Sequence, residues 1–194
     1  MPTRYVRLPT SPVRQAGHPG IARACTLRGG RRAYPRRMSL PEVCVVYLLR
    51  RGPRGTEVLL GDKRTGLGQG KVVGIGGKLD HGESPEEAAV REVEEEIGVR
   101  IEASALHLAG TIDYHFPTRP AWSQRSTVFV CRRFQGEPVE TAEITPRWYA
   151  LDAVPYPRMW DDASRWLPGV LRGGTVDARF TFGSDLSTVV LTAV

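Results

Sequence analysis

The chain has 194 residues, 41% of them apolar and 25% charged, a composition that excludes a fibre or a wholly disordered chain. It contains no run of 18 apolar residues and no apolar stretch typical of a secretory signal, which argues against a transmembrane or secreted protein. Cys25, Cys44 and Cys131 lie far apart, so we expect neither a disulfide framework nor a zinc site. These features together favour a cytoplasmic location.

The net charge of +6 is distributed unevenly along the chain. Residues 1–37 contain nine arginines and no acidic residue, which leaves residues 38–194 with 18 basic and 21 acidic side chains. The first segment is rich in Pro and Gly without an apolar period, so we expect it to be a disordered leader. It could be a basic arm for nucleic acid or an anionic surface, or an organelle transit peptide. We favour a misassigned start at Met1, because the ordered pattern begins directly after Met38.

Residues 38–194 show a mixed α/β pattern, and the acidic balance of this part argues against a nucleic-acid-binding domain. The first two strands should form a hairpin. Short apolar runs predict strands at Val43–Leu49, Glu57–Gly61, Val72–Ile75, Leu106–Phe116, Ser126–Arg132, Arg147–Leu151, Arg179–Phe182 and Thr188–Thr192. Helices are predicted at Ser84–Ile97 and Asp162–Arg172.

The first helix has the clearest boundaries. Ser84 is a good N-cap, Pro85 suits the first helical position, and Glu87 lies three residues after Ser84, which completes a capping box. Gly98 follows the last apolar residue, Ile97, and supplies a C-terminal stop. We therefore expect a helix with both ends fixed by local sequence.

Three carboxylates share one face of this helix, because Glu92, Glu95 and Glu96 are spaced at i, i+3 and i+4. Like charges at this spacing are destabilising, and Arg91 is expected to point elsewhere. A divalent cation would relieve the repulsion, and oxygen ligands suit Mg²⁺ or Mn²⁺, which share their coordination shell with phosphates. The helix thus favours phosphoryl or pyrophosphoryl chemistry, although a solvated acidic surface is the alternative.

The spacing around these carboxylates resembles the Nudix box of the MutT-type hydrolases. The matching positions are Gly77, Glu83, Arg91, Glu92, Val93, Glu95, Glu96, Gly98 and Val99. The resemblance implies an α/β (α+β) Nudix fold, with a mixed sheet sandwiched between helices and a loop–helix–loop at the box. It also implies hydrolysis of a nucleoside diphosphate linked to another group.

The resemblance implies roles for the residues of the box and one outside it. Mg²⁺, or Mn²⁺, would be held by Glu92, Glu95, Glu96, Glu143 and the Gly77 carbonyl. Either Glu95 or Glu143 would act as the general base. Lys78 would contact phosphate. Glu83 and Arg91 would form an ion pair that braces the loop against the helix.

Similarity to the animal-type MutT homologues, which hydrolyse oxidised purine nucleoside triphosphates such as 8-oxo-dGTP, implies a base pocket. Its residues would be Leu67, Val73, Tyr114, Phe116, Trp160 and Asp162. Val73 stands where that group has an Asn that recognises the base. Ala163 stands where the group has its second acidic residue, although Asp161 could supply this acid if the alignment shifts by one residue. These departures leave open an undamaged dNTP, ADP-ribose, a dinucleoside polyphosphate or a non-catalytic nucleotide-sensing module. We expect the chain to bind a small nucleotide and not to associate with a membrane, and the sequence leaves its oligomeric state open.

Overall fold

The computed structural model describes residues 40–53 and 55–193. The predicted leader, residues 1–37, and the proposed initiator Met38 lie outside the described residues. Within the described part, no helix has the length and apolar character needed to cross a membrane. Among the described residues, Cys44 and Cys131 are buried, free thiols.

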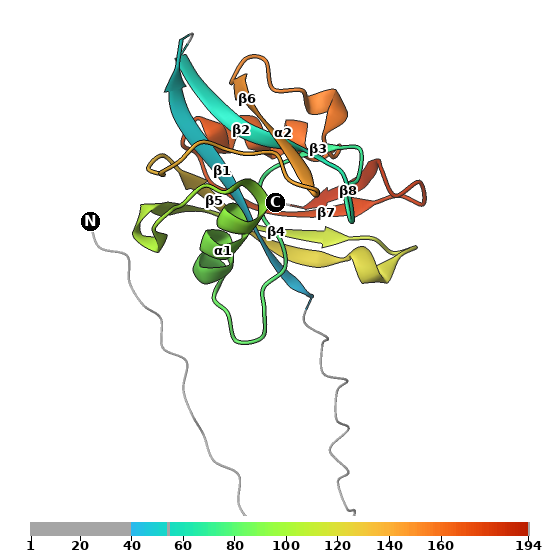
Figure 1. The fold of residues 1–194 in the computed structure, drawn as a ribbon. Helices are drawn as coiled ribbons and strands as arrows, with labels where there is room; N and C mark the ends of the chain where they lie inside the picture. Colours follow the sequence, from blue (N-terminus) through green and yellow to red (C-terminus); the bar gives the residue numbers. More distant parts are fainter. Residues whose placement is uncertain (1–39, 54, 194) are drawn as a thin grey trace, which may run out of the picture. The chain divides into compact units, whose positions relative to one another are not determined.

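A mixed sheet forms the centre of the domain (Figure 1). Its strands are β1 (Glu42–Gly52), β2 (Gly55–Lys63), β3 (Val72–Val73), β4 (Leu106–His115), β5 (Gln124–Cys131), β6 (Ile144–Ala150), β7 (Val176–Phe182) and β8 (Val189–Ala193). The strand order is β3-β2-β1-β5-β4-β7-β8, and β6 pairs with β2. The β1–β5 and β4–β7 pairs are parallel and the others antiparallel. The predicted hairpin of β1 and β2 is confirmed.

One helix covers each face of the sheet, α1 (Pro85–Ile97) on one side and α2 (Ala163–Leu171) on the other. Successive side chains of a strand point to opposite faces, and β1 shows the consequence. Val46 and Leu48 pack with the apolar side of α1, whereas Tyr47 and Leu49 pack with that of α2. Three short 3₁₀ turns complete the domain, at Ala103–Ala105, Pro120–Trp122 and Tyr156–Arg158.

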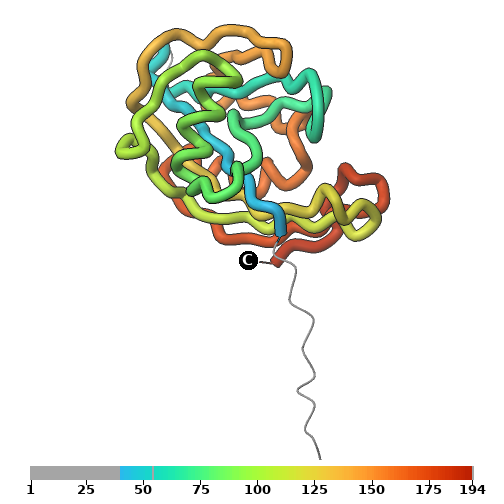
Figure 2. Tube along the Cα trace, turned by 60° about the horizontal axis from the view of Figure 1, so that its bottom comes forward, coloured from blue at the N-terminus to red at the C-terminus, as the bar shows by residue number. Residues whose placement is uncertain are grey.

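The turn between β7 and β8 lies beside the connection between β4 and β5, as Figure 2 shows for the neighbouring red and yellow loops. The parallel register of β4 and β7 brings these two connections to the same edge of the sheet. Phe116 and Phe182 stack there with centroids 4.5 Å apart. This edge therefore supplies an aromatic cluster that lies far from the acidic helix in sequence.

Candidate active site

Helix α1 begins and ends where the sequence predicts. The Ser84 hydroxyl accepts the Glu87 N–H at 3.2 Å while the Glu87 carboxylate accepts the Ser84 N–H at 2.8 Å, and Gly98 closes the helix with φ of 69°. On its inner side Ala88, Ala89, Val93 and Ile97 are fully buried against the sheet. The carboxylates of the predicted metal site are thus carried by a helix held at both ends and along one face.

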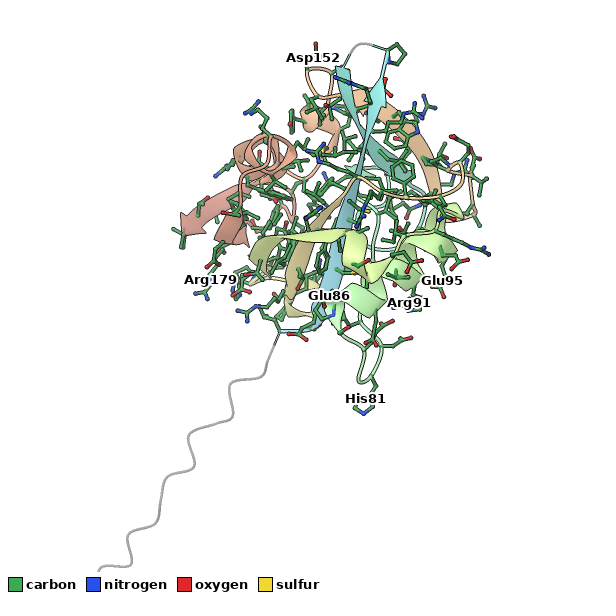
Figure 3. The ribbon with its side chains drawn as sticks, turned by 90° about the vertical axis from the view of Figure 1, so that its left-hand side faces the viewer. His81, Glu86, Arg91, Glu95, Asp152 and Arg179 are labelled. Carbon is green, nitrogen blue, oxygen red and sulfur yellow. The ribbon has the colours of Figure 1, made fainter. Side chains whose placement is uncertain are left out.

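The predicted brace between Glu83 and Arg91 is present. The Arg91 guanidinium donates two parallel bonds to the Glu83 carboxylate, of 2.9 and 2.8 Å, and a third of 3.0 Å to the Lys78 carbonyl. These bonds hold the pKa of Glu83 down, at about 2. His81 lies at the tip of the loop before α1, away from Arg91 (Figure 3).

The expectation that Arg91 points away from the carboxylates was wrong. Its Nη1 donates to Glu92 at 2.9 Å and to Glu95 at 3.1 Å, and Figure 3 shows Arg91 beside Glu95 on the outside of α1. A guanidinium has five N–H groups, so one arginine can hold three acidic neighbours. Repulsion on this face is therefore partly relieved by a cation belonging to the helix itself.

Glu92 lies half-buried against the glycine loop. A Cβ at Gly77 would come within 2.3 Å of the Glu92 Oε1, so a larger residue there would require this carboxylate to shift. Burial raises the pKa of Glu92 and outweighs the opposing bond from Arg91. A desolvated carboxylate in this position favours a cation nearby.

Glu96, the most deeply buried of the helix carboxylates, is held from two sides. Its Oε1 accepts from the Lys63 ammonium at 2.5 Å and its Oε2 accepts from the Gly76 N–H at 3.0 Å. Lys63 also lies 3.5 Å from the Oε2 of Glu143. Burial lowers the Lys63 pKa, but the bonds and charges of Glu96 and Glu143 together outweigh this and leave it raised. Sequence reasoning missed Lys63, because no local pattern joins it to residues 33 and 80 positions away.

The backbone of the two glycines faces the same region. The Gly77 carbonyl, the predicted metal ligand, accepts the Cys44 N–H at 2.9 Å and retains one lone pair. Among the bonds within residues 40–53 and 55–193, no backbone N–H donates to the Gly76 carbonyl. Gly76 has φ of +151°, and a Cβ there would lie 2.2 Å from the Cys44 carbonyl oxygen. Glycine is required at Gly76 for this close approach.

A cavity of about 410 Å³ opens beside this region. Its lining contains Lys63, Gly77 and Glu143 from the polar end. All the predicted base-pocket residues also line it, together with the predicted phosphate contact: Leu67, Val73, Lys78, Tyr114, Phe116, Trp160 and Asp162. The structure thus gathers residues from β2, β3, β4, α2 and several loops around one space. Glu92, Glu95 and Glu96 are not among the lining residues, but Glu96 contacts Lys63, which is.

Trp160 is held in an aromatic cluster. Phe116, Trp122 and Phe182 contact its ring nearly at right angles, with centroids 5.5 to 6.4 Å away. The Lys71 ammonium lies over the ring, 4.8 Å from its centroid. Trp122 and Phe182 were not identified from the sequence, because their place beside Trp160 depends on strand pairing.

Asp162 is the buried carboxyl of the pocket. Its Oδ2 accepts from Trp166 Nε1 at 2.7 Å and from the Tyr114 hydroxyl at 3.1 Å, whereas Oδ1 has no partner among the residues that the structure describes. Burial raises the pKa of Asp162 despite these two bonds. Asp161 does not replace the missing second acid, because its carboxylate accepts from Arg165 and from the Val189 N–H outside the cavity lining.

The fold and the site together define a class of protein. A capped acidic helix, braced by a preceding glycine loop against a mixed sheet, is the loop–helix–loop that the Nudix resemblance implies. The family model of the NUDIX domain matches residues 38–170, which is more than half of the chain. The chain therefore belongs to the Nudix family, and it is a Nudix hydrolase.

Curated relatives agree with this assignment. The chain is 35% identical over 133 residues to the oxidized purine nucleoside triphosphate hydrolase of Mus musculus, covering 69% of this chain and 83% of the relative. It is 38% identical over 115 residues to the protein of the same name in Danio rerio, covering 59% and 72% respectively. A solved MutT protein from Bacillus halodurans superposes with a TM-score of 0.64 at 21% identity, covering 79% of this chain and 97% of that one. That likeness confirms the fold alone.

Proposed function

We propose that this Nudix hydrolase cleaves oxidised purine nucleoside triphosphates, such as 8-oxo-dGTP, to the monophosphate and pyrophosphate in a Mg²⁺-dependent reaction. The observation that carries the proposal is the single cavity whose lining contains both a carboxylate end, with Lys63 and Glu143, and an aromatic end, with Trp160 and Asp162. The names of the mouse and zebrafish relatives support the same substrate class.

The oxygen donors at the carboxylate end fit a hard divalent cation. Glu92, Glu95, Glu96 and Glu143 would hold it with a glycine carbonyl, because Mg²⁺ and Mn²⁺ prefer oxygen ligands. Within the described ranges, no three carboxylates yet converge as a ready-made metal cluster. Lys63 and Arg91 instead lie against them, and this partial neutralisation supports the presence of a cation at this face. When bound, the metal would neutralise phosphate charge and lower the pKa of a water molecule.

The protein's own groups would divide the remaining work. Glu95 and Glu143 are both exposed carboxylates, and either could accept the proton of the attacking water. Lys63 and Lys78 line the cavity and would contact phosphate oxygens. Trp160 would stack on the base, and the free Oδ1 of Asp162 would bond to its edge.

A comparison of nucleotides tests the proposal. The kcat/KM of the full chain would be measured with Mg²⁺ for 8-oxo-dGTP, 2-hydroxy-dATP, dGTP and ADP-ribose, with the products separated by chromatography. We expect the two oxidised purines to be preferred and pyrophosphate to be released. Preference for ADP-ribose would contradict the substrate, and nucleotide binding without turnover would favour the sensing module.

A further inference from the structure

The Lys63 ammonium stands between carboxylates of two separate segments. It lies 2.5 Å from Glu96 on helix α1 and 3.5 Å from Glu143, which immediately precedes strand β6. Lys63 ends strand β2, and its pairing with Ile144 in β6 places it next to Glu143. The contact therefore follows from the register of the sheet and not from a chance meeting of surface side chains.

Both oxygens of Glu96 are engaged, because Oε2 accepts the Gly76 N–H while Oε1 accepts from Lys63. Glu96 is only 5% exposed, and a buried carboxylate without a cation would be costly. A divalent ion that uses Oε1 must therefore compete with the lysine for this oxygen.

Lys63 is held by fewer bonds than Arg91. Arg91 is fixed by two bonds to Glu83 and one to the Lys78 carbonyl, in addition to its bonds to the helix carboxylates. Lys63 has a flexible four-carbon stem and lines the open cavity. The lysine is therefore the more readily displaced of these two cations, because fewer bonds hold it.

We propose that Lys63 is an internal counter-cation, which neutralises Glu96 and Glu143 in the metal-free protein and is displaced when a divalent metal binds. The proposal rests on the metal dependence in the proposed function. It assigns Lys63 two opposing effects: it stabilises the protein without metal, and it weakens the affinity for the metal.

Substitution of the lysine tests both effects without any nucleotide. Lys63→Met removes the charge and keeps an unbranched side chain, and Mn²⁺ binding is measured by titration calorimetry on the full chain. We expect the Kd for Mn²⁺ to fall about tenfold, which is the order of effect of losing one charge-assisted hydrogen bond. The thermal midpoint without metal should fall, and Mn²⁺ should raise it by more than in the wild type.

Lys71→Met is the matched control, because it removes the same charge from a lysine that contacts Trp160 and, among the residues the structure describes, forms no ion pair with a carboxylate. Its Kd for Mn²⁺ should stay within about twofold of the wild type, since a more distant charge is screened. The double variant Lys63→Met/Glu96→Gln pairs two neutral side chains. Without metal, its thermal midpoint should be higher than that of Lys63→Met. Its Kd for Mn²⁺ should no longer be lower than that of the wild type.

An unchanged or weaker Mn²⁺ affinity in folded Lys63→Met would overturn the inference, as would an equal gain in Lys71→Met. If wild type hydrolyses 8-oxo-dGTP but these affinities do not differ, the inference alone fails. If the affinities rank as expected but no nucleotide triphosphate is cleaved, the proposed function fails and the counter-cation assignment stands.

Discussion

The two ends of the cavity are built in different ways. The carboxylate end depends largely on one stretch, residues 76–99, whose helix, caps and glycine loop fix each other locally. The aromatic end is assembled from side chains of separate segments, including Val73, Tyr114 and Trp160. The family spacing is complete at the first end and altered at the second, where Val73 and Ala163 stand. Chemistry and base selection can therefore change independently in this protein.

The largest effect should come from the carboxylate end. Glu96→Gln replaces a charged group with a neutral one of the same shape, and kcat should fall about 10²-fold or more, as for other lost electrostatic groups in active sites. The amide can still accept a bond from Lys63 or from the Gly76 N–H, so circular dichroism should show an intact fold. Glu94→Gln is the control, because Glu94 is an exposed partner of Arg100 on the same helix. A near-normal kcat at saturating Mg²⁺ would remove Glu96 from the site.

The same contrast explains what the sequence could predict. The boundaries of α1, its capping box and the Glu83–Arg91 pair were confirmed, because each depends on residues within one helix or its adjoining loop. The strands were also placed within a few residues, since short apolar runs flanked by Gly and Pro indicate them directly.

Long-range contacts were beyond such reasoning. The link from Lys63 to Glu143 needs the pairing of β2 with β6, and the position of Phe182 beside Phe116 needs the β4–β7 register. A single sequence carries no information about strand partners beyond adjacent hairpins. The family resemblance supplied the pocket residues that these pairings bring together, but gave no hint of Lys63.

At the aromatic end, removal of the stacking ring should mainly weaken binding. Trp160→Ala should raise KM for purine nucleotides about tenfold to a hundredfold, because stacking on an aromatic side chain contributes about 1–3 kcal/mol per base. The kcat should change only a few-fold, since the carboxylates are untouched. Trp148→Ala is the control: Trp148 stacks on Phe134 and lies outside the cavity lining. An unchanged KM in Trp160→Ala would show that the base does not stack there.

The altered position Val73 should control selectivity more modestly. Val73 and Trp160 border the same glycine, since a Cβ at Gly68 would lie 3.5 Å and 3.4 Å from them. An amide introduced by Val73→Asn gains a bond only from a base with a matching edge, so the ratio of kcat/KM for 8-oxo-dGTP over dGTP should rise about tenfold. Val73→Leu should leave the ratio unchanged. A wild type that already discriminates a thousandfold would contradict this assignment.

The smallest effect concerns stability and isolates the buried carboxyl of the aromatic end. Because burial raises the pKa of Asp162, the folded state keeps its proton at pH values where the unfolded state has lost it. The free energy of unfolding should therefore fall as pH rises from the ordinary Asp pKa, about 3.9, to the raised value, and level off above it. The expected decline is about 1.4 kcal/mol for each pH unit of this window.

The variant Asp162→Asn has no carboxyl group to titrate at this position, so its free energy of unfolding should not show this decline. The bond from Arg125 lowers the pKa of Asp113, so protonation of Asp113 on acidification destabilises the folded state instead. Wild type and Asp162→Asn both contain Asp113, so its contribution cancels in the difference between their free energies of unfolding. Urea unfolding of the two proteins from pH 3 to pH 8 gives that difference, and parallel curves would mean that the pKa of Asp162 is the same in the folded and unfolded states.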